Sequence, residues 1–505
     1  MSSNKKYWQS VEELKENSSI VETLQNKEFV EEIPTDEFLG DKDTLSGSTT
    51  TRRDFLKYVG FSTAAASLAA CEGPVIRSIP YVVQPDRIVP GVANYYATTI
   101  ADGFDFAGVL VKTREGRPIK IEQNILANTG ANARVHASVL SLYDSQRLKR
   151  PVSNGEVVSW ETFDTDVRQQ LNAVSGDIVL LTQTFASPST TRLISEFSQR
   201  YPNVRHVVYD TVSEDAALDA FESRYGQRAL ANYDFSKAET IVSIGADFLG
   251  DWAGGGYDAA YARGRVPQNG RMSRHIQFES NFSLTGANAD KRIPVKLSQQ
   301  RAVLNALNAM IGGGGTTSDL PPAIMQAVES AAAQLRRSGS SAVVVSGIPD
   351  AQAQAQVLSI NEALGSQVMD SGNPRMVRQG NSSQVQQLIA DMNAGSVGAI
   401  MIAGVNPAYS LPNANEFVEG LKNVELSIAF SMKADETAKL CKFIAATPHY
   451  LESWGDVQLT RRNFTLMQPT IRPLFDTRQF QDTLLRWTDN TNSYNDYIQE
   501  TWSGS

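Results

Sequence analysis

Short apolar runs alternate with helix-length amphipathic stretches from about residue 160 onward, and this alternation dominates the chain. The runs that predict strands are 177–182, 205–209, 240–244, 275–278, 341–346, 398–403, 426–430 and 442–446. The stretches that predict helices between them include 163–172, 189–201, 213–225 and 323–337. Apolar strands that alternate with helices indicate βαβ units, and therefore parallel sheets covered by helices on both faces.

A glycine-rich segment at 312–317 interrupts the alternation, and we expect it to link two doubly wound sheets. Before them, strands at 94–99, 107–112 and 118–121 predict a β-rich lobe with a hairpin turn at Glu115-Gly116. The predicted domains are an acidic leader (1–50), a signal-like segment (51–71), an extended arm and β-rich lobe (72–158), a first α/β domain (159–311), a second α/β domain (316–446) and an irregular C-terminal segment (447–505).

The composition excludes several classes of protein. A net charge of −9 argues against a general nucleic-acid binder with a basic face. Two cysteines are too few for a disulfide scaffold and for the roughly four thiolates of a typical iron–sulfur cubane. The chain has no uncharged run of about 18 apolar residues, so it is not a bundle of membrane-spanning helices. Metal chemistry would have to use few ligands or belong to a partner.

The N-terminal region carries the features of an export signal. Residues 1–50 hold eleven acidic residues against five lysines, and they form either short amphipathic helices or a solvated leader. Arg52-Arg53 before an alanine-rich run predicts a Tat-type address, with an ordinary helix start as the alternative. Cys71 ends a Leu-Ala-Ala-Cys sequence that fits a lipobox, and an unmodified cysteine is the alternative.

Loops that follow predicted strands are the natural ligand positions in doubly wound sheets. Glycines there let a phosphate approach the backbone, and an Asp can accept a hydroxyl or a guanine edge, although plain glycine turns are the alternative. The candidate residues of the first and second corners are Gly245, Asp247, Asp251, Gly404, Asn406 and Pro407. A third loop, 447–455, contains His449.

No catalytic or metal-binding residue is predicted. The four histidines are far apart and lack metal-ligand spacing. The chain contains no P-loop, no nucleophile elbow and no cysteine–histidine nucleophile signature. Cys441 borders a predicted strand, which favours a buried small apolar residue.

Residues 107–152 carry a family resemblance. They contain Val-Lys-Thr-Arg-Glu-Gly-Arg-Pro-Ile-Lys-Ile-Glu at 111–122, Ala-Ser-Val-Leu-Ser-Leu-Tyr-Asp at 137–144 and Arg-Leu-Lys-Arg-Pro at 147–151. This stretch resembles the opening segment of the molybdopterin oxidoreductase superfamily, whose members place a pterin dinucleotide between two α/β domains. The two glycine corners and Leu-Glu-Ser-Trp-Gly at 451–455 resemble its dinucleotide loops and the segment beyond its second sheet. The resemblance implies an α/β molybdopterin-oxidoreductase-like body with two doubly wound parallel-sheet domains plus a β-rich N-terminal lobe.

The leader narrows the resemblance. Tyr7-Trp8, the twin-arginine segment and Cys71-Glu72-Gly73-Pro74 resemble a group with an extended Tat-type signal. That group includes the large periplasmic iron–sulfur/molybdopterin-like subunit of alternative complex III, a quinol-oxidising respiratory complex. Catalytic superfamily members commonly carry a cysteine cluster for a [4Fe–4S] centre before the lobe, and here only Cys71 precedes it. The ferredoxin-like half of that group is also absent after Cys441, so the chain is a fragment or that half is a separate polypeptide.

The resemblance implies a structural subunit without a cofactor of its own, on the periplasmic face of the inner membrane and lipid-anchored if Cys71 is acylated. Its implied partners are an iron–sulfur ferredoxin-like module, c-type cytochrome subunits and a quinol-binding integral membrane subunit. Iron–sulfur clusters and c-type haem would belong to that complex. The alternative is an active molybdenum oxidoreductase whose two glycine corners hold a bis-guanine-dinucleotide cofactor. A third possibility is a polysaccharide- or peptide-binding lipoprotein on the same fold.

Overall fold

The computed structural model describes residues 88–89, 91–127, 129–201, 203–267, 270, 272–313 and 319–503. The acidic leader, the twin-arginine segment with Arg52 and Arg53, and Cys71 lie outside these residues, so their roles stay predictions. The same holds for most of the expected arm and for residues 314–317 of the glycine-rich segment. Within the described ranges, no helix combines the length and the apolar character needed to cross a membrane.

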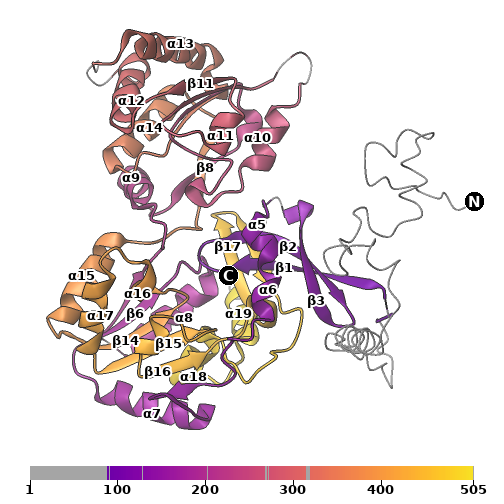
Figure 1. Ribbon diagram of the computed structural model, residues 1–505, viewed down its shortest axis with the longest axis vertical. Helices are drawn as coiled ribbons and strands as arrows, with labels where there is room; N and C mark the ends of the chain where they lie inside the picture. Colours follow the sequence, from indigo (N-terminus) through magenta and orange to yellow (C-terminus); the bar gives the residue numbers. More distant parts are fainter. Residues whose placement is uncertain are drawn as a thin grey trace, which may run out of the picture. The chain divides into compact units, whose positions relative to one another are not determined.

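A three-stranded antiparallel sheet confirms the predicted β-rich lobe (Figure 1). Its strands are β1 (Ala93–Ala101), β2 (Phe106–Arg114) and β3 (Arg117–Gln123), followed by η2 (Ile125–Ala127), α5 (Ala133–Ala137) and α6 (Val139–Leu142). Glu115 and Gly116 have φ of +50° and +75°, which is the backbone of a type I′ hairpin turn. Val111 and Ile121 are buried against Leu142, so the short helices cover the inner face of the sheet.

The larger parallel sheet has seven strands in the order β5-β4-β16-β15-β14-β6-β7. Five of them run parallel, and β4 and β5 form an antiparallel hairpin at one edge. The bounds are β4 (Val152–Ser153), β5 (Glu156–Val157), β6 (Asp177–Thr182), β7 (Val204–Val208), β14 (Val397–Ala403), β15 (Leu426–Ser431) and β16 (Phe443–Ala446). The sequence predicts each parallel strand to within one residue at either end.

Helices cover both faces of this sheet because alternate side chains of its strands enter different cores. Leu180 and Met401 belong to one core, and their neighbours Leu181 and Ile402 belong to the other. The first core includes residues of α7 (Trp160–Ala173), α8 (Pro188–Arg200), α18 (Phe480–Trp487) and α19 (Tyr494–Ser503). The second includes residues of α15 (Ser382–Asn393) and α17 (Ala414–Lys422).

A second parallel sheet has the order β11-β10-β9-β12. It comprises β9 (Thr240–Ile244), β10 (Arg274–Glu279), β11 (Lys291–Pro294) and β12 (Ala342–Ser346). Helices α12 (Leu297–Ile311), α13 (Pro322–Ser338) and α14 (Ala351–Ala363) share a core with it. A second core contains aromatic side chains, including the stacked rings of Phe235 and Phe248. The remaining short elements are α9 (Asp215–Tyr225), η3 (Phe235–Lys237), η4 (Trp252–Gly254), α10 (Asp258–Gly264), α11 (Leu284–Ala287), η5 (Gly339–Ser341), α16 (Pro407–Ser410), η6 (Ala438–Leu440) and η7 (Tyr450–Glu452).

The two parallel sheets do not follow one another along the chain. β12 lies after the glycine-rich segment but pairs with β9, which lies before it. β14 also lies after that segment, and it pairs with β6 near the start of the first predicted domain. The expectation that 312–317 separates one sheet in 159–311 from another in 316–446 is therefore wrong. The β9–β12 unit is inserted into the larger sheet, because long-range strand pairing sets sheet membership and the local pattern does not encode it.

Much of the described part of segment 447–505 forms regular elements, which corrects the expectation of irregular structure, whereas residues 468–479 are irregular as expected. It forms β17 (Gly455–Thr460), β18 (Asn463–Met467), α18 and α19. β17 and β18 join an antiparallel sheet, β18-β17-β13-β8, with β8 (Leu230–Tyr233) and β13 (Met369–Arg375). Phe480, Leu484 and Trp487 of α18 are buried in the core of the larger sheet. This burial stabilises a short helix whose apolar residues lie on one face, a pattern that the expectation of irregular structure missed.

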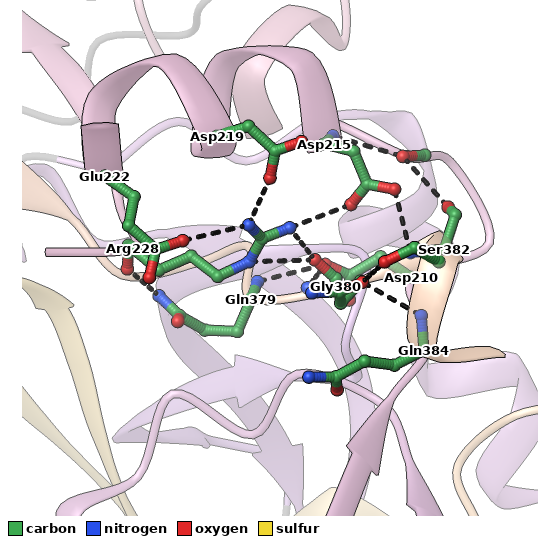
Figure 2. Close-up of polar contacts among 12 residues, drawn as sticks. Asp210, Asp215, Asp219, Glu222, Arg228, Gln379, Gly380, Ser382 and Gln384 are labelled. Atoms are coloured by element: carbon green, nitrogen blue, oxygen red, sulfur yellow. Dashed lines mark hydrogen bonds and ion pairs between the residues drawn. The ribbon is translucent and has the colours of Figure 1, made fainter. Parts of the chain in front are cut away.

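The chain crosses between the larger sheet and the inserted unit before α9 and again before α15, and one arginine joins the two crossings (Figure 2). The Arg228 guanidinium donates to Asp215 at 3.1 Å and to the backbone carbonyl of Gly380 at 2.6 Å. The Asp215 carboxylate also accepts the backbone N–H of Ser382 at 2.8 Å. Asp210 accepts the backbone N–H of Gly380, again at 2.8 Å. We call this group the Arg228 junction.

Candidate functional site

The carboxyl ends of β6, β14, β15 and β16 lie at one edge of the larger sheet, where a cavity of about 480 Å³ opens. Gly404 and Asn406, which follow β14, line this edge cavity together with residues of the third predicted loop. Ligands bind at this edge in doubly wound sheets. The two loops, which the sequence indicates as ligand positions, therefore lie beside one cavity.

Gly404 is exposed beside the edge cavity, and Gln183 lies against one side of it. Gly404 has a φ of +73°, and a Cβ added there would overlap the Gln183 side chain. On its other side Gln183 faces Gly103, where an added Cβ would lie 2.6 Å from the Gln183 Cβ. With its amide oriented to satisfy both partners, Gln183 donates to the backbone carbonyls of Asp102 at 2.6 Å and Gly404 at 2.9 Å. Gln183 therefore occupies the space that a larger side chain at 404 would need, while the glycine itself stays exposed to the cavity.

Asn406 and Pro407 have structural roles within the chain. The Asn406 Oδ1 accepts the backbone N–H and the hydroxyl of Thr437 at 3.1 and 2.7 Å. Its Nδ2 donates to Glu436 at 2.7 Å. Pro407 is buried at the first position of α16, where a missing N–H breaks no helical hydrogen bond.

In the corner after β9, Gly245 is partly exposed and a glutamine again lies against it. Gly245 has a φ of +67°, and a Cβ added there would lie 2.8 Å from the Oε1 of Gln300, a buried residue of α12. The Gln300 amide is held by a hydrogen bond to the Ser280 hydroxyl at 3.1 Å. The Asp247 Oδ1 accepts the backbone N–H and the hydroxyl of Thr285 at 2.9 and 2.6 Å.

Asp251 lies in a different environment. It pairs with Arg134 at 2.6 Å, and Arg134 also pairs with Asp105 of the lobe at 2.9 Å. The hydrogen bond from Arg134 lowers the pKa of Asp251. Asp251 lines a second cavity, of about 660 Å³, beside the glycine run 254–256. Gly245, Asp247 and Pro407 line neither cavity, so the structure divides the predicted site residues among separate places.

Sequence reasoning misses a fully buried ion pair between Arg147 and Glu452. Both side chains are 0% exposed, and the Arg147 Nη2 lies 2.5 Å from the Glu452 Oε2. Glu452 also accepts the backbone N–H groups of His449 at 2.7 Å and Leu474 at 2.9 Å. The two charged residues stand in segments that carry the family resemblance, yet they are 305 positions apart. No local signal in the sequence could have paired them.

His449 is a structural histidine. Its Nε2 lies 2.9 Å from the Ser141 hydroxyl and 3.2 Å from the Ser138 carbonyl, and its Nδ1 accepts the backbone N–H of Leu451. Burial, and then the charge of Arg147, lower the pKa of His449 to about 4, so the ring is neutral at neutral pH. The Nε2 contacts hold the third loop against the lobe, and the Nδ1 contact lies within the loop itself.

The described residues offer no metal centre. No group of three or more His, Cys, Asp or Glu side chains among them is arranged to hold a metal ion. Burial raises the pKa of the Cys441 thiol to about 12, which keeps it protonated and a poor metal ligand. Cys441 packs beside two apolar clusters but is only partly buried, so its burial is less complete than the sequence predicts.

A pterin dinucleotide, the cofactor that the resemblance raises, would find these corners partly engaged within the chain. Glutamine side chains lie against Gly245 and Gly404, although Gly404 is exposed and Gly245 partly exposed. The expected acceptors for its polar groups, Asp247 and Asn406, are engaged by threonines of the chain itself.

Comparison with known proteins gives a distant relative and a fold. No family model matches the sequence. The menaquinone reductase, molybdopterin-binding-like subunit of Nitratidesulfovibrio vulgaris is 23% identical over 498 residues, which covers 86% of this chain and 71% of that protein. Acetylene hydratase from Pelobacter acetylenicus matches with a TM-score of 0.59 and 12% identity, over 78% of this chain and 69% of that one. The chain thus has the α/β fold of the molybdopterin oxidoreductase-like superfamily, and the menaquinone reductase subunit is its distant homologue.

Proposed function

We propose that this chain is a structural, cofactor-free subunit of a quinone-linked respiratory complex. The observation that carries the proposal is that both corners make contacts within the chain: Gln183 lies against Gly404 and Gln300 against Gly245, and Asn406 and Asp247 accept hydrogen bonds from threonines. These contacts use the corner residues for packing and hydrogen bonds within the chain. The superfamily's fold then serves as a scaffold on which redox subunits assemble.

The distant homologue supports the respiratory part of the proposal. Its name places a molybdopterin-binding-like subunit in a menaquinone reductase. By homology, we infer a molybdopterin-like subunit of a multi-subunit complex that reacts with quinone. The direction of electron flow would be set by redox centres on the partners, because the described residues of this chain offer no metal centre.

Our finer proposal is a quinol-oxidising complex of the alternative complex III type, which passes electrons to cytochrome c or an oxidase. The leader and residues 107–152 support it through their resemblance to the large periplasmic subunit of that complex. The chain would be exported by the Tat-type signal at Arg52 and Arg53 and held at the periplasmic face of the inner membrane by a lipid on Cys71. It would support an iron–sulfur ferredoxin-like module near c-type cytochromes and a quinol-binding membrane subunit.

The test is the metal and haem content of the detergent-solubilised complex purified through this chain. We expect iron and c-type haem without molybdenum. Molybdenum near one atom per chain would contradict the cofactor-free role and favour the alternative, an active molybdenum oxidoreductase with a bis-guanine-dinucleotide cofactor. A chain that purifies without iron and haem would contradict the proposed assembly.

A further inference from the structure

The edge cavity stays open although Gln183 lies against Gly404. Its volume of about 480 Å³ lies within the range of about 300–1,000 Å³ typical of small-molecule sites. Aromatic and methionine side chains make up much of its wall, including Phe185, Phe430, Met432, Trp454 and Phe480. Aromatic walls favour flat rings, which bind by stacking or edge contacts.

The charged side chains of the wall are already engaged. Asp456 is buried and accepts the Ser187 and Ser189 hydroxyls at 2.6 and 2.8 Å. Lys433 forms an ion pair with Asp144. The other two carboxylates of the wall, Asp102 and Asp435, accept the backbone N–H groups of Asp105 and Ala438 at 2.7 and 2.8 Å. An anionic ligand would therefore lose its hydration without gaining a free cation, because Lys433 is already paired, and this disfavours it.

The same engagement disfavours a peptide as occupant. A peptide brings a backbone N–H and C=O at each residue, and these need partners when they leave water. Amide side chains of the edge cavity already form hydrogen bonds within the chain. Gln479 bonds to both the backbone N–H and the C=O of Trp454, and Asn406 accepts the hydroxyl of Thr437. A neutral molecule with few polar groups matches this wall better.

Thr447 supplies the wall with an available donor. It follows β16 and lines the cavity, and its backbone N–H donates to the Ser431 carbonyl at 3.1 Å. Its hydroxyl has no hydrogen-bond partner among the described residues, so it can donate to a ligand oxygen.

We propose that the edge cavity binds a neutral, flat ring compound that bears carbonyl groups, the chemistry of a quinone head group. The ring lies against the aromatic wall, and the Thr447 hydroxyl donates to one carbonyl oxygen. The isolated chain is sufficient for this binding, whereas the proposed function requires partner subunits. An experiment can therefore reject the binding while the assembly holds, or reject the assembly while the binding holds.

The full 505-residue chain, purified by itself, is titrated by calorimetry with menadione, a naphthoquinone without a charged group. We expect one site per chain. 2-Methylnaphthalene has the same rings without carbonyls, and we expect it to bind about fivefold more weakly, the effect of one lost hydrogen bond. Absence of menadione binding would overturn the proposal. Equal affinity for both compounds would overturn the role of Thr447.

Two variants localise the site. Val405→Trp adds bulk to the cavity wall and should abolish binding, whereas Val212→Trp changes a half-exposed valine outside the cavity and should not. Thr447→Val keeps the side-chain shape but removes the hydroxyl, so it should lower the affinity for menadione to that for 2-methylnaphthalene. Near-ultraviolet circular dichroism checks that each variant is folded. If the Val405→Trp chain does not fold, the affinity of the Thr447→Val chain for menadione tests the proposal instead. Unchanged binding in a folded Val405→Trp chain would overturn the proposal.

Discussion

At the residue scale, two glycines with the same φ allow the steric effect of Gln183 on position 404 to be measured. Gly404 and Gly395 both have a φ of +73°, but an added Cβ meets nothing within 4 Å at Gly395 and overlaps Gln183 at Gly404. We expect Gly395→Ala to lower the free energy of unfolding by about 1 kcal/mol through backbone strain. Gly404→Ala should lower it by a further 1–3 kcal/mol or so through overpacking. Urea unfolding measures both.

A double variant isolates the contribution of Gln183. In a Gln183→Ala background the alanine at 404 has room, so the extra loss should disappear and leave the backbone cost alone. If Gly404→Ala costs no more than Gly395→Ala in the native background, Gln183 does not crowd the corner and the main support for a cofactor-free role is lost.

The Arg147–Glu452 pair belongs to the same scale. Arg147→Met leaves a carboxylate buried without its counter-charge, and we expect the free energy of unfolding to fall by about 3–5 kcal/mol. Lys120→Met is the matched control, because Lys120 is 62% exposed and pairs with Glu122 at 3.0 Å on the surface. The control should change stability by less than about 1 kcal/mol. Similar losses in both variants would mean that the pair is not buried in solution.

At the scale of elements, the Arg228 junction depends on helix geometry. Asp215, Asp219 and Glu222 are spaced along α9 so that all three carboxylates reach the same guanidinium (Figure 2). Arg228 thereby connects α9 to the crossing at Gly380.

Arg228→Ala should loosen both crossings. We expect faster hydrogen exchange in residues 209–215 and 376–382, because backbone groups there lose the support of the junction. Arg224→Ala is the control, since Arg224 lies on α9 close to Arg228 in sequence but is exposed and pairs with Glu362. Equal exchange in the two variants would show that the junction does not hold the crossings.

At the scale of the whole molecule, separate cores predict separate unfolding. Phe163 is buried in a core of the larger sheet, and Val344 is buried in a core of the inserted unit. Phe163→Ala should remove about 3–5 kcal/mol of stability. It should raise hydrogen exchange in β6 and β14 more than in β9 and β12, and Val344→Ala should do the reverse. Uniform loss of protection in both variants would mean that the chain unfolds as one cooperative unit.

The sequence by itself determined the local elements and the fold class. Apart from β11, which the apolar pattern missed, the parallel strands and the hairpin turn at Glu115-Gly116 follow from apolar runs and turn residues, which act over a few positions. The sequence also indicated the loops after β14 and β16 as ligand positions, and in the structure they lie beside one cavity.

Only the tertiary structure decided how these elements combine. The pairing of β12 with β9 and of β14 with β6 depends on contacts between distant segments, so the expected division at 312–317 failed. The candidate site differs from the one expected from the sequence for the same reason. Gln183 and Gln300 lie against their glycine corners only after folding brings them there, and Arg147 reaches Glu452 across 305 positions. Local patterns report what each segment prefers, whereas burial and pairing between segments set what a site can hold.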